Sequence, residues 1–261
     1  MAVFYDQLNR GVNLSSLPKR IISIVPSQTE LLFYLGLNEE VIGITKFCIH
    51  PADKFINVTK VGGTKQLNIA KIKELKPDLV IANKEENEQG QIQELMNFCP
   101  VWISDISNLN EALDMITKIG ELVGHATQAE ILVSAIKQQF NALFTHPLNL
   151  RAAYLIWRKP YMAAGTATFI NNMLQYSGLT NAFAESRYPV VSKQMLSDAQ
   201  PDVVLLSSEP YPFTQKHIEE FKTFLPNAQI LLVDGEMFSW YGSRLLHAPA
   251  YFEQLAGLVN G

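Results

Sequence analysis

Short apolar runs separated by helical patterns recur along the whole chain. In the first half they lie at residues 21–25, 41–44, 79–82 and 101–103, and in the second half at residues 152–157, 203–206 and 230–233. Short continuous apolar runs are typical of strands that are buried on both faces of a sheet. Because helical patterns lie between them, the sequence predicts βαβ units around mainly parallel sheets.

Residues that start and end helices support this interpretation. Ser27 and Glu30 have the spacing of a capping box, and Gly36 is placed to close the helix that follows. Asn68 opens a second predicted helix, which must end before Pro77 because proline cannot continue a helix.

The pattern changes over residues 108–144, where helical periodicity continues without a strand-like run. Asn108 predicts the start of one helix, and Thr127 with Glu130 predicts the start of a longer helix that ends near Pro147. We therefore predict an α/β fold of two Rossmann-like lobes joined by one long helix. The predicted parts are an N-terminal lobe over residues 1–126, a linking backbone helix over residues 127–147 and a C-terminal lobe over residues 148–261.

The two halves repeat a short motif. Residues 76–85 align with residues 200–209: in both, a proline and an aspartate precede a buried strand, and a glutamate stands eight residues after the proline. Tyr34 and Tyr176 each stand two residues before a glycine and leucine pair. These repeats occur in the same order, so we infer a duplicated α/β lobe.

The ordered set of motifs extends over nearly the whole chain. It comprises residues 6–12, 18–30, 41–45, 61–63 and 76–81 in the first half, and residues 165–171, 188–192 and 201–204 in the second half. In this order the motifs resemble the substrate-binding proteins of ABC importers that have a helical backbone between their lobes. Members of that family carry vitamin B12, haem or ferric siderophores, and the pattern is closest to the B12-binding members.

The resemblance implies that a stiff helix limits the motion of the lobes and that the ligand occupies a cleft between them. It implies a component that captures a metal chelate, either a corrinoid such as vitamin B12 or an iron complex such as haem or a ferric siderophore, and delivers it to a membrane permease. It further implies a monomer with no intrinsic cofactor and no enzymatic activity, in a periplasmic or membrane-peripheral location.

Candidate ligand residues follow from the strand ends and from ligand chemistry. Open α/β sheets bind ligands outside the carboxyl ends of their strands, and a large planar chelate needs aromatic faces and polar arms. The helix starts at Ser27 and Thr166 are also expected to aim backbone N–H groups at polar ligand groups. We expect the ligand to contact Ser27, Gln28, Phe47, Thr64, Lys65, Asn83, Trp157, Arg158, Tyr161, Arg187, Tyr188, Glu236, Trp240, Tyr241 and Arg244.

The ligand's identity stays open among corrinoid, haem and siderophore. Cobalamin-binding members commonly carry tryptophan at two positions where this chain has Thr64 and Asn83. In this respect the chain departs from the corrinoid pattern. The cations Lys65, Arg158 and Arg244 suit carboxylates on any of the three ligand classes. Cys48 and His50 form no recognisable metal spacing with other residues, so bare metal capture is not expected.

Acidic residues shared by the two halves are candidates for docking on the permease. In the resembling family each lobe exposes an acid that pairs with basic residues of the permease. Glu209 is the candidate in the second half, and Glu85 or Glu86 is the candidate in the first half. Charge pairs of this kind chiefly set encounter and orientation.

Composition and charge limit the remaining classes. The 261 residues carry a net charge of −4 without a basic block, which excludes nucleic acid and anionic membrane surfaces as partners. Hydrolase, phosphate-loop, dinucleotide and zinc-protease motifs are absent, so a metallocofactor enzyme is the least favoured alternative. The first residues lack a secretory signal, so the leading alternative is a cytoplasmic protein of the same fold that buffers a corrinoid or haem.

Overall fold

The computed structural model describes residues 2–143 and 147–260 of the chain. Residues 144–146, near the expected end of the linking helix, lie outside the described residues. Contacts divide the chain into two compact units. The first contains the chain up to Ile106 together with Asn110–Ala135 and Tyr241–Arg244, and the second contains Ser107–Leu109, Ile136–Trp240 and the chain from Leu245 onward.

The first unit is built on a five-stranded parallel sheet in the order β5-β4-β3-β6-β7. The chain therefore winds outward in opposite directions from β3 and β6, which places a switch point of a Rossmann-like sheet between these two strands. The strands are β3 (Ile21–Ser23), β4 (Val41–Ile44), β5 (Thr59–Lys60), β6 (Leu79–Asn83) and β7 (Val101–Ser104).

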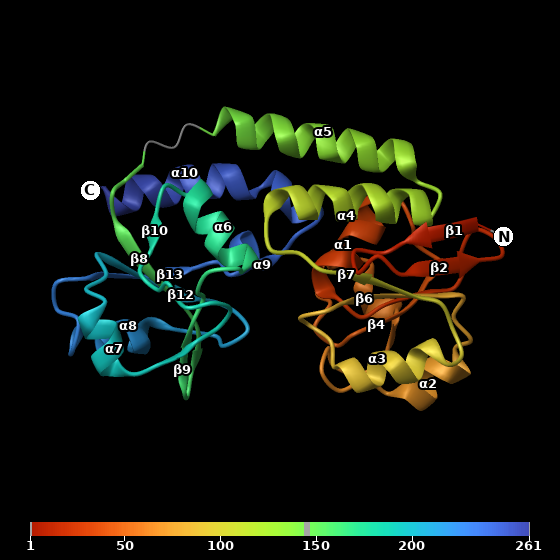
Figure 1. Ribbon diagram of the computed structural model, residues 1–261, viewed down its shortest axis with the longest axis horizontal. Helices are drawn as coiled ribbons and strands as arrows, with labels where there is room; N and C mark the ends of the chain where they lie inside the picture. The colour runs from red at the N-terminus through yellow and green to blue at the C-terminus, as the bar shows by residue number, and fades with distance from the viewer. Residues whose placement is uncertain (1, 144–146, 261) are drawn as a thin grey trace. The chain divides into compact units, whose positions relative to one another are not determined.

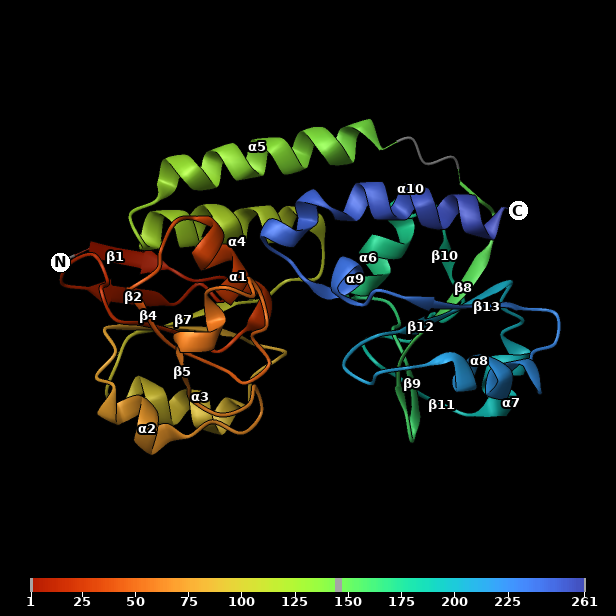
Figure 2. The ribbon, with the colours of Figure 1, turned by 180° about the vertical axis from the view of Figure 1, so that it is seen from behind.

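Helices cover both faces of this sheet. Figures 1 and 2 show α1 and α4 on one face and α2 and α3 on the other. The first two strands of the chain form an antiparallel pair, and the N–H of Gln7, just after the first of them, donates to the carbonyl of Ile103 at 3.1 Å. The elements are β1 (Ala2–Tyr5), β2 (Gly11–Leu14), α1 (Pro26–Tyr34), a 3-10 turn (Phe55–Asn57), α2 (Ile69–Glu74), α3 (Gln89–Met96) and α4 (Leu109–Leu122).

The second unit has a mixed six-stranded sheet in the order β11-β9-β8-β12-β13, with β10 also paired to β8. Its parallel strands are β8 (Arg151–Arg158), β10 (Thr180–Asn181), β12 (Val203–Ser207) and β13 (Gln229–Val233). β9 (Tyr161–Ala163) lies between β8 and β11 (Val190–Val191) and pairs antiparallel with both, so β11 forms this edge of the sheet. The sequence predicted the longer strands β8, β12 and β13 but not β9, β10 and β11, because strands of two or three residues produce no periodic signal.

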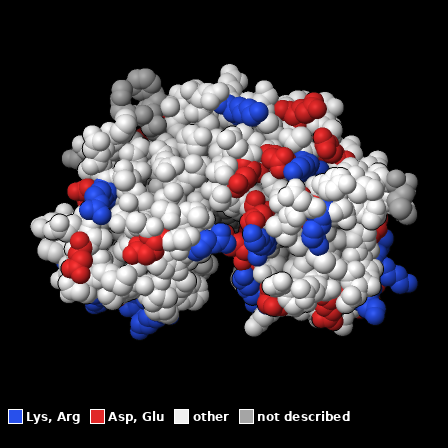
Figure 3. Space-filling model, viewed as in Figure 1, with Lys and Arg blue, Asp and Glu red and all other residues white. Residues whose placement is uncertain are grey.

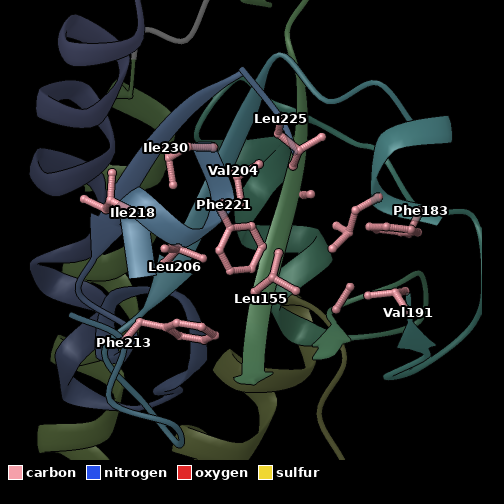
Figure 4. Close-up of a cluster of buried hydrophobic side chains, with 13 residues drawn as sticks. Leu155, Phe183, Val191, Val204, Leu206, Phe213, Ile218, Phe221, Leu225 and Ile230 are labelled. Atoms are coloured by element: carbon pink, nitrogen blue, oxygen red, sulfur yellow. The ribbon is translucent and has the colours of Figure 1, made fainter. Parts of the chain in front are cut away.

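Helices also cover both faces of the second sheet. α6 (Phe169–Tyr176), α9 (Glu236–Ser239) and α10 (Ala248–Val259) lie on one face, and α7 (Lys193–Asp198) and α8 (Gln215–Lys222) on the other (Figures 1 and 2). Under α8 the Phe221 ring packs against β8 beside Leu155 and Leu206 (Figure 4). Truncating such a fully buried side chain to alanine costs about 3–5 kcal/mol, so this cluster fixes the helix to the sheet.

The long helix α5 (Ala126–Ala142) occupies most of the predicted linking segment. The boundary between the two units falls inside it, after Ala135. The three-part division at residues 126 and 147 stays a prediction. No helix among the described residues is long and apolar enough to cross a membrane.

Two predicted helix signals in the first unit are confirmed and one is wrong. Asn68 caps α2, because its side chain accepts the N–H of Lys71 at 3.0 Å, and Gly36 follows α1 with a positive φ of 99°. Ser27 is not a cap. α1 starts at Pro26 with Val25 as the N-cap and no side-chain cap bond, since proline is well suited to the first helical position.

In the second unit the cap of α6 lies two residues later than predicted. Thr168, rather than Thr166, accepts the N–H of Asn171 at 3.1 Å through its hydroxyl. Thr166 instead donates its hydroxyl to the carbonyl of Ala184 at 3.1 Å. Thr127 also lies within the first turn of α5, which begins at Ala126.

Candidate functional site

The predicted ligand residues fall on both units. Ser27, Gln28, Phe47, Thr64, Lys65, Asn83, Tyr241 and Arg244 belong to the first unit, and Trp157, Arg158, Tyr161, Arg187, Tyr188, Glu236 and Trp240 belong to the second. Their role in binding a ligand stays a prediction.

In the first unit, Ser27 and Gln28 lie in the first turn of α1, directly after β3 at the switch point. Both side chains are buried, and the hydroxyl of Ser27 and the Oε1 atom of Gln28 have no hydrogen-bond partner among the described residues. The amide nitrogen of Gln28 donates to Ser104 Oγ, on β7. Because α1 starts without a side-chain cap, its backbone N–H groups are suited to receive polar ligand groups.

Asn83 ends β6 at the other side of the switch point, but its amide is already used within the unit. Its Nδ2 donates to Ser104 Oγ at 3.0 Å, and its Oδ1 accepts the N–H groups of Glu85 and Glu86 at 2.8 and 2.9 Å. This arrangement turns the chain sharply after the strand and orients both acidic residues.

The loop after β4 presents an exposed aromatic ring. Phe47 is 51% exposed, and the ammonium of Lys46 lies 5.1 Å from the ring centroid. The adjacent thiol of Cys48 is buried and lies 3.2 Å from Thr29 Oγ1. Burial raises the pKa of this thiol, so Cys48 supports the loop rather than reacting with a ligand.

Thr64 and Lys65 are tied to the loop that carries the acidic residues. The Lys65 ammonium donates to the carbonyl of Glu85 at 2.6 Å, and the amide of Asn87 donates to the carbonyl of Thr64 at 3.1 Å. The two loops that follow β5 and β6 therefore form one hydrogen-bonded surface.

Tyr241 and Arg244 also have partners in the first unit. The Tyr241 hydroxyl donates to Glu86. The Arg244 guanidinium contacts Glu30 on α1 at 2.6 and 3.2 Å, with both side chains largely buried. Arg244 therefore neutralises Glu30, a partner that lies 214 residues away in sequence.

In the second unit, Trp157, Arg158 and Tyr161 lie at the β8–β9 hairpin. The Arg158 guanidinium donates to Glu220 Oε2 at 2.7 and 2.9 Å, and the Tyr161 hydroxyl donates to Glu220 Oε1. Although burial opposes it, these hydrogen bonds hold the pKa of Glu220 below its ordinary value. Trp157 is 39% exposed and packs edge-on against Tyr211 at a centroid distance of 5.8 Å.

Arg187 follows a short bridge between Thr166 and Ser186. A Cβ at Gly165 would lie 2.0 Å from the carbonyl oxygen of Glu185, so only glycine permits this close approach. Arg187 adopts a left-handed φ of 68°, and Tyr188 beside it is half-buried. The segment is therefore fixed by its backbone.

Glu209 and Trp240 contact each other in the second unit. The indole Nε1 of Trp240 and the hydroxyl of Ser239 both donate to Glu209 Oε1, at 2.8 and 2.7 Å. Burial raises the pKa of the Glu209 carboxyl, while these two donors act in the opposite direction. Glu236, in the first turn of α9, donates its N–H to Asp234 at 3.0 Å.

Glu30, Glu220 and Ser239 are partners of predicted site residues, but no sequence pattern marks them as such. Single-sequence patterns detect neighbours within a helix turn, whereas Glu220 lies 62 residues from Arg158. Two of the predicted cations are thus ion-paired within their own units.

Other features do not coincide with the predicted residues. A hollow of about 540 Å³ in the first unit is lined by other residues, including Val41 and Thr59, the first residues of β4 and β5. It therefore opens near the amino ends of these strands. Among residues 2–143 and 147–260 no cluster of His, Cys, Asp and Glu is arranged to hold a metal. On the face in Figure 3, acidic and basic side chains are interspersed.

The family model described as "Periplasmic binding protein" matches residues 21–225. The chain is 25% identical over 255 residues to the vitamin B12-binding protein of Pectobacterium carotovorum subsp. carotovorum (strain PC1), covering 94% of this chain and 91% of that protein.

Two solved structures share the fold. The periplasmic haem-binding protein of Vibrio cholerae matches with a TM-score of 0.77 at 20% identity, covering 93% of this chain and 99% of that one. The molybdate periplasmic binding protein of Haemophilus influenzae matches with a TM-score of 0.83 at 16% identity, covering 100% of this chain and 91% of that one. The α/β fold predicted from the sequence is confirmed, and this chain belongs to the periplasmic binding protein family.

Proposed function

We propose that this protein is the substrate-binding component of an ABC importer and that it captures a metal chelate, either a corrinoid or an iron complex. The observation that carries the proposal is the start of α1 at the sheet switch point, which has no side-chain cap. A helix start without a side-chain cap is suited to direct backbone N–H groups at polar groups on the edge of a ligand.

The exposed rings support the same ligand class. Phe47 in the first unit and Trp157 in the second lie at carboxyl ends of parallel strands, where this fold binds ligands. Large planar ligands bury apolar area against such rings. The family match over residues 21–225 and the vitamin B12-binding relative point in the same direction.

A ligand screen tests this function. The purified protein is incubated with cobalamin, cobinamide, haem, several ferric siderophores and molybdate, and melting temperature and absorbance are recorded. A ligand that binds only the folded state stabilises it by about 2.7 kcal/mol at a concentration one hundred times its Kd. This added stability raises the melting temperature. A response to one chelate is expected. A response to none, or to molybdate alone, overturns the proposal.

Matched variants then locate the binding surface. Phe47→Ala and Trp157→Ala are expected to weaken the responding chelate by about tenfold each, since aromatic anchors dominate binding energy. Tyr34→Ala is the control, because Tyr34 is similarly exposed at the end of α1 but lies outside the predicted site. Equal affinity in all three variants would remove these rings from the site.

The permease is the proposed partner, with Glu209 and either Glu85 or Glu86 as docking residues. By position, Glu85 corresponds to Glu209: the N–H of Glu85 donates to Asn83 Oδ1 at 2.8 Å and that of Glu209 to Ser207 Oγ at 3.3 Å. Replacing all three glutamates with alanine is expected to abolish association with the transporter in liposomes at low salt. Undiminished association would contradict the docking role.

A periplasmic location is part of the proposal, because the relatives of the family are periplasmic. Cell fractionation with an antibody tests it. Release with periplasmic markers is expected, whereas retention with cytosolic markers would favour a cytoplasmic buffer of the same ligand.

A further inference from the structure

Two consecutive aromatic residues, Trp240 and Tyr241, mark a point where the chain leaves the second unit and enters the first. Trp240 is the last residue of a long segment of the second unit, and Tyr241 begins the four-residue segment Tyr241–Arg244 that belongs to the first. Trp240 follows α9 with an extended backbone. Each of the two side chains donates a hydrogen bond to a glutamate of its own unit.

In the second unit Glu209 binds the side chain of Trp240, where the chain leaves this unit. Its Oε1 accepts both the Trp240 indole N–H at 2.8 Å and the Ser239 hydroxyl at 2.7 Å. A Cβ at Gly235 would lie 2.6 Å from Glu209 Cγ, so glycine is required for the glutamate to reach this position. Hydrogen bonds to a charged carboxylate are roughly twice as strong as neutral ones, which favours a fixed orientation of the indole.

In the first unit Glu86 binds Tyr241, because its carboxylate accepts a hydrogen bond from the Tyr241 hydroxyl. The segment is anchored at its far end by the Arg244 contact to Glu30 at 2.6 Å. Between these contacts Gly242 has a φ of 157°, and a Cβ there would lie 3.1 Å from the carbonyl oxygen of Ser27. The four residues are therefore fixed against α1.

We propose that Glu86 and Glu209 are positioning residues that hold the Tyr241 and Trp240 rings, and that a cationic partner which pairs with these carboxylates competes with the rings for them. The inference rests on the proposed function, because both rings are predicted ligand residues and both glutamates are predicted docking residues. Docking then loosens the two rings and weakens ligand retention. By linkage, bound ligand weakens docking by the same factor.

The Trp240 indole N–H signal in a ¹⁵N–¹H spectrum reports directly on this contact. The chain has three tryptophans, and the Trp240 signal is identified by its loss in Trp240→Phe. In the wild type the signal is expected to move with pH at a midpoint above the ordinary glutamate range, since burial raises the pKa of Glu209 and the nearby Glu236 and Asp234 raise it further.

Conservative and truncating variants separate positioning from a merely structural role. Glu209→Gln keeps an acceptor oxygen, so the signal should stay near its wild-type position but lose that pH dependence. Glu209→Ala should shift the signal towards that of a solvent-exposed indole. Exposed Glu219→Gln in the second unit is the control and should change neither property. An unchanged signal in Glu209→Ala overturns the proposal.

A basic peptide tests the competition. Adding tri-arginine to the wild type should move the Trp240 signal towards its position in Glu209→Ala, and Glu209→Gln should respond several times less. The chelate that responds in the ligand screen should bind Glu86→Ala and Glu209→Ala about tenfold more weakly, with Glu94→Gln on α3 as the unaffected control. If no chelate binds, the proposed function fails, yet the spectra still decide whether Glu209 positions Trp240.

Discussion

Asp78 and Asp202 each bind the backbone at the start of a strand in their own unit through the same pair of hydrogen bonds. The N–H of Asp78 donates to the carbonyl of Arg20 at 3.0 Å, and its carboxylate accepts the N–H of Arg20 at 3.0 Å. The N–H of Asp202 donates to the carbonyl of Arg151 at 2.9 Å, and its carboxylate accepts the N–H of Arg151 at 2.7 Å. The sequence repeat at residues 76–85 and 200–209 is thus a structural repeat.

The hydrogen bonds of these two aspartates should contribute measurably to the free energy of unfolding. Asp78→Ala and Asp202→Ala are each expected to lower the free energy of unfolding by about 1–2 kcal/mol, because each removes a carboxylate acceptor from backbone N–H groups. Urea denaturation followed by circular dichroism measures the change. Exposed Asp53→Ala is the control and should stay within about 0.5 kcal/mol of the wild type. Loss in only one of the two variants would argue against equivalent roles.

The repeat also explains why the parallel sheets could be predicted. Lys76 and Gln200 both adopt a left-handed φ, 47° and 45°, at the end of a helix, and a proline follows each of them. Proline stops the helix, and the buried strand after it has a continuous apolar pattern. Local signals of this kind are readable in one sequence.

Contacts between distant residues could not be predicted. The Glu220 partner of Arg158 and the Glu30 partner of Arg244 depend on how helices pack against the sheets, and no local spacing encodes that. The predicted helix starts at Ser27 and Thr166 were wrong for a different reason. A serine is a cap only where its own backbone is extended, and Pro26 places Ser27 inside the helix instead.

The corrected caps lead to contrasting stability changes. Thr168→Ala should lower the free energy of unfolding by about 1 kcal/mol, because it removes the bond to the Asn171 N–H. Ser27→Ala should have no such effect in the ligand-free protein, because its buried hydroxyl has no partner among the described residues. Denaturant titration of both variants decides the matter, and equal losses would restore Ser27 as a cap.

The two cysteines should be inert in the folded protein. Burial raises the pKa of Cys48, and it raises the pKa of Cys99 to about 12. Since the thiolate is the reactive form, little reaction with Ellman's reagent is expected at pH 8 in buffer, and two thiols should react promptly in guanidinium chloride. Rapid reaction of one thiol in the native protein would show that its loop opens readily.

The stability of the second unit should depend on the protonation of His217. In the capping box of α8, His217 Nδ1 accepts the N–H of Thr214 at 2.8 Å, so the ring must be unprotonated on that nitrogen. Burial, followed by the nearby charges of Arg158 and Lys216, lowers the pKa of His217 below its ordinary value.

Because the unfolded chain binds this proton more readily, the free energy of unfolding should fall as the pH drops below about 6.5. The expected loss between pH 7 and pH 5 is on the order of 1 kcal/mol, the usual contribution of an N-cap bond. His217→Gln tests the cause, since glutamine is a common residue at this position of a capping box and does not titrate. Melting temperatures of both proteins at pH 7 and pH 5 should show a larger decrease for the wild type than for the variant. If the two decreases are equal, other groups govern the acid sensitivity and His217 contributes only its packing.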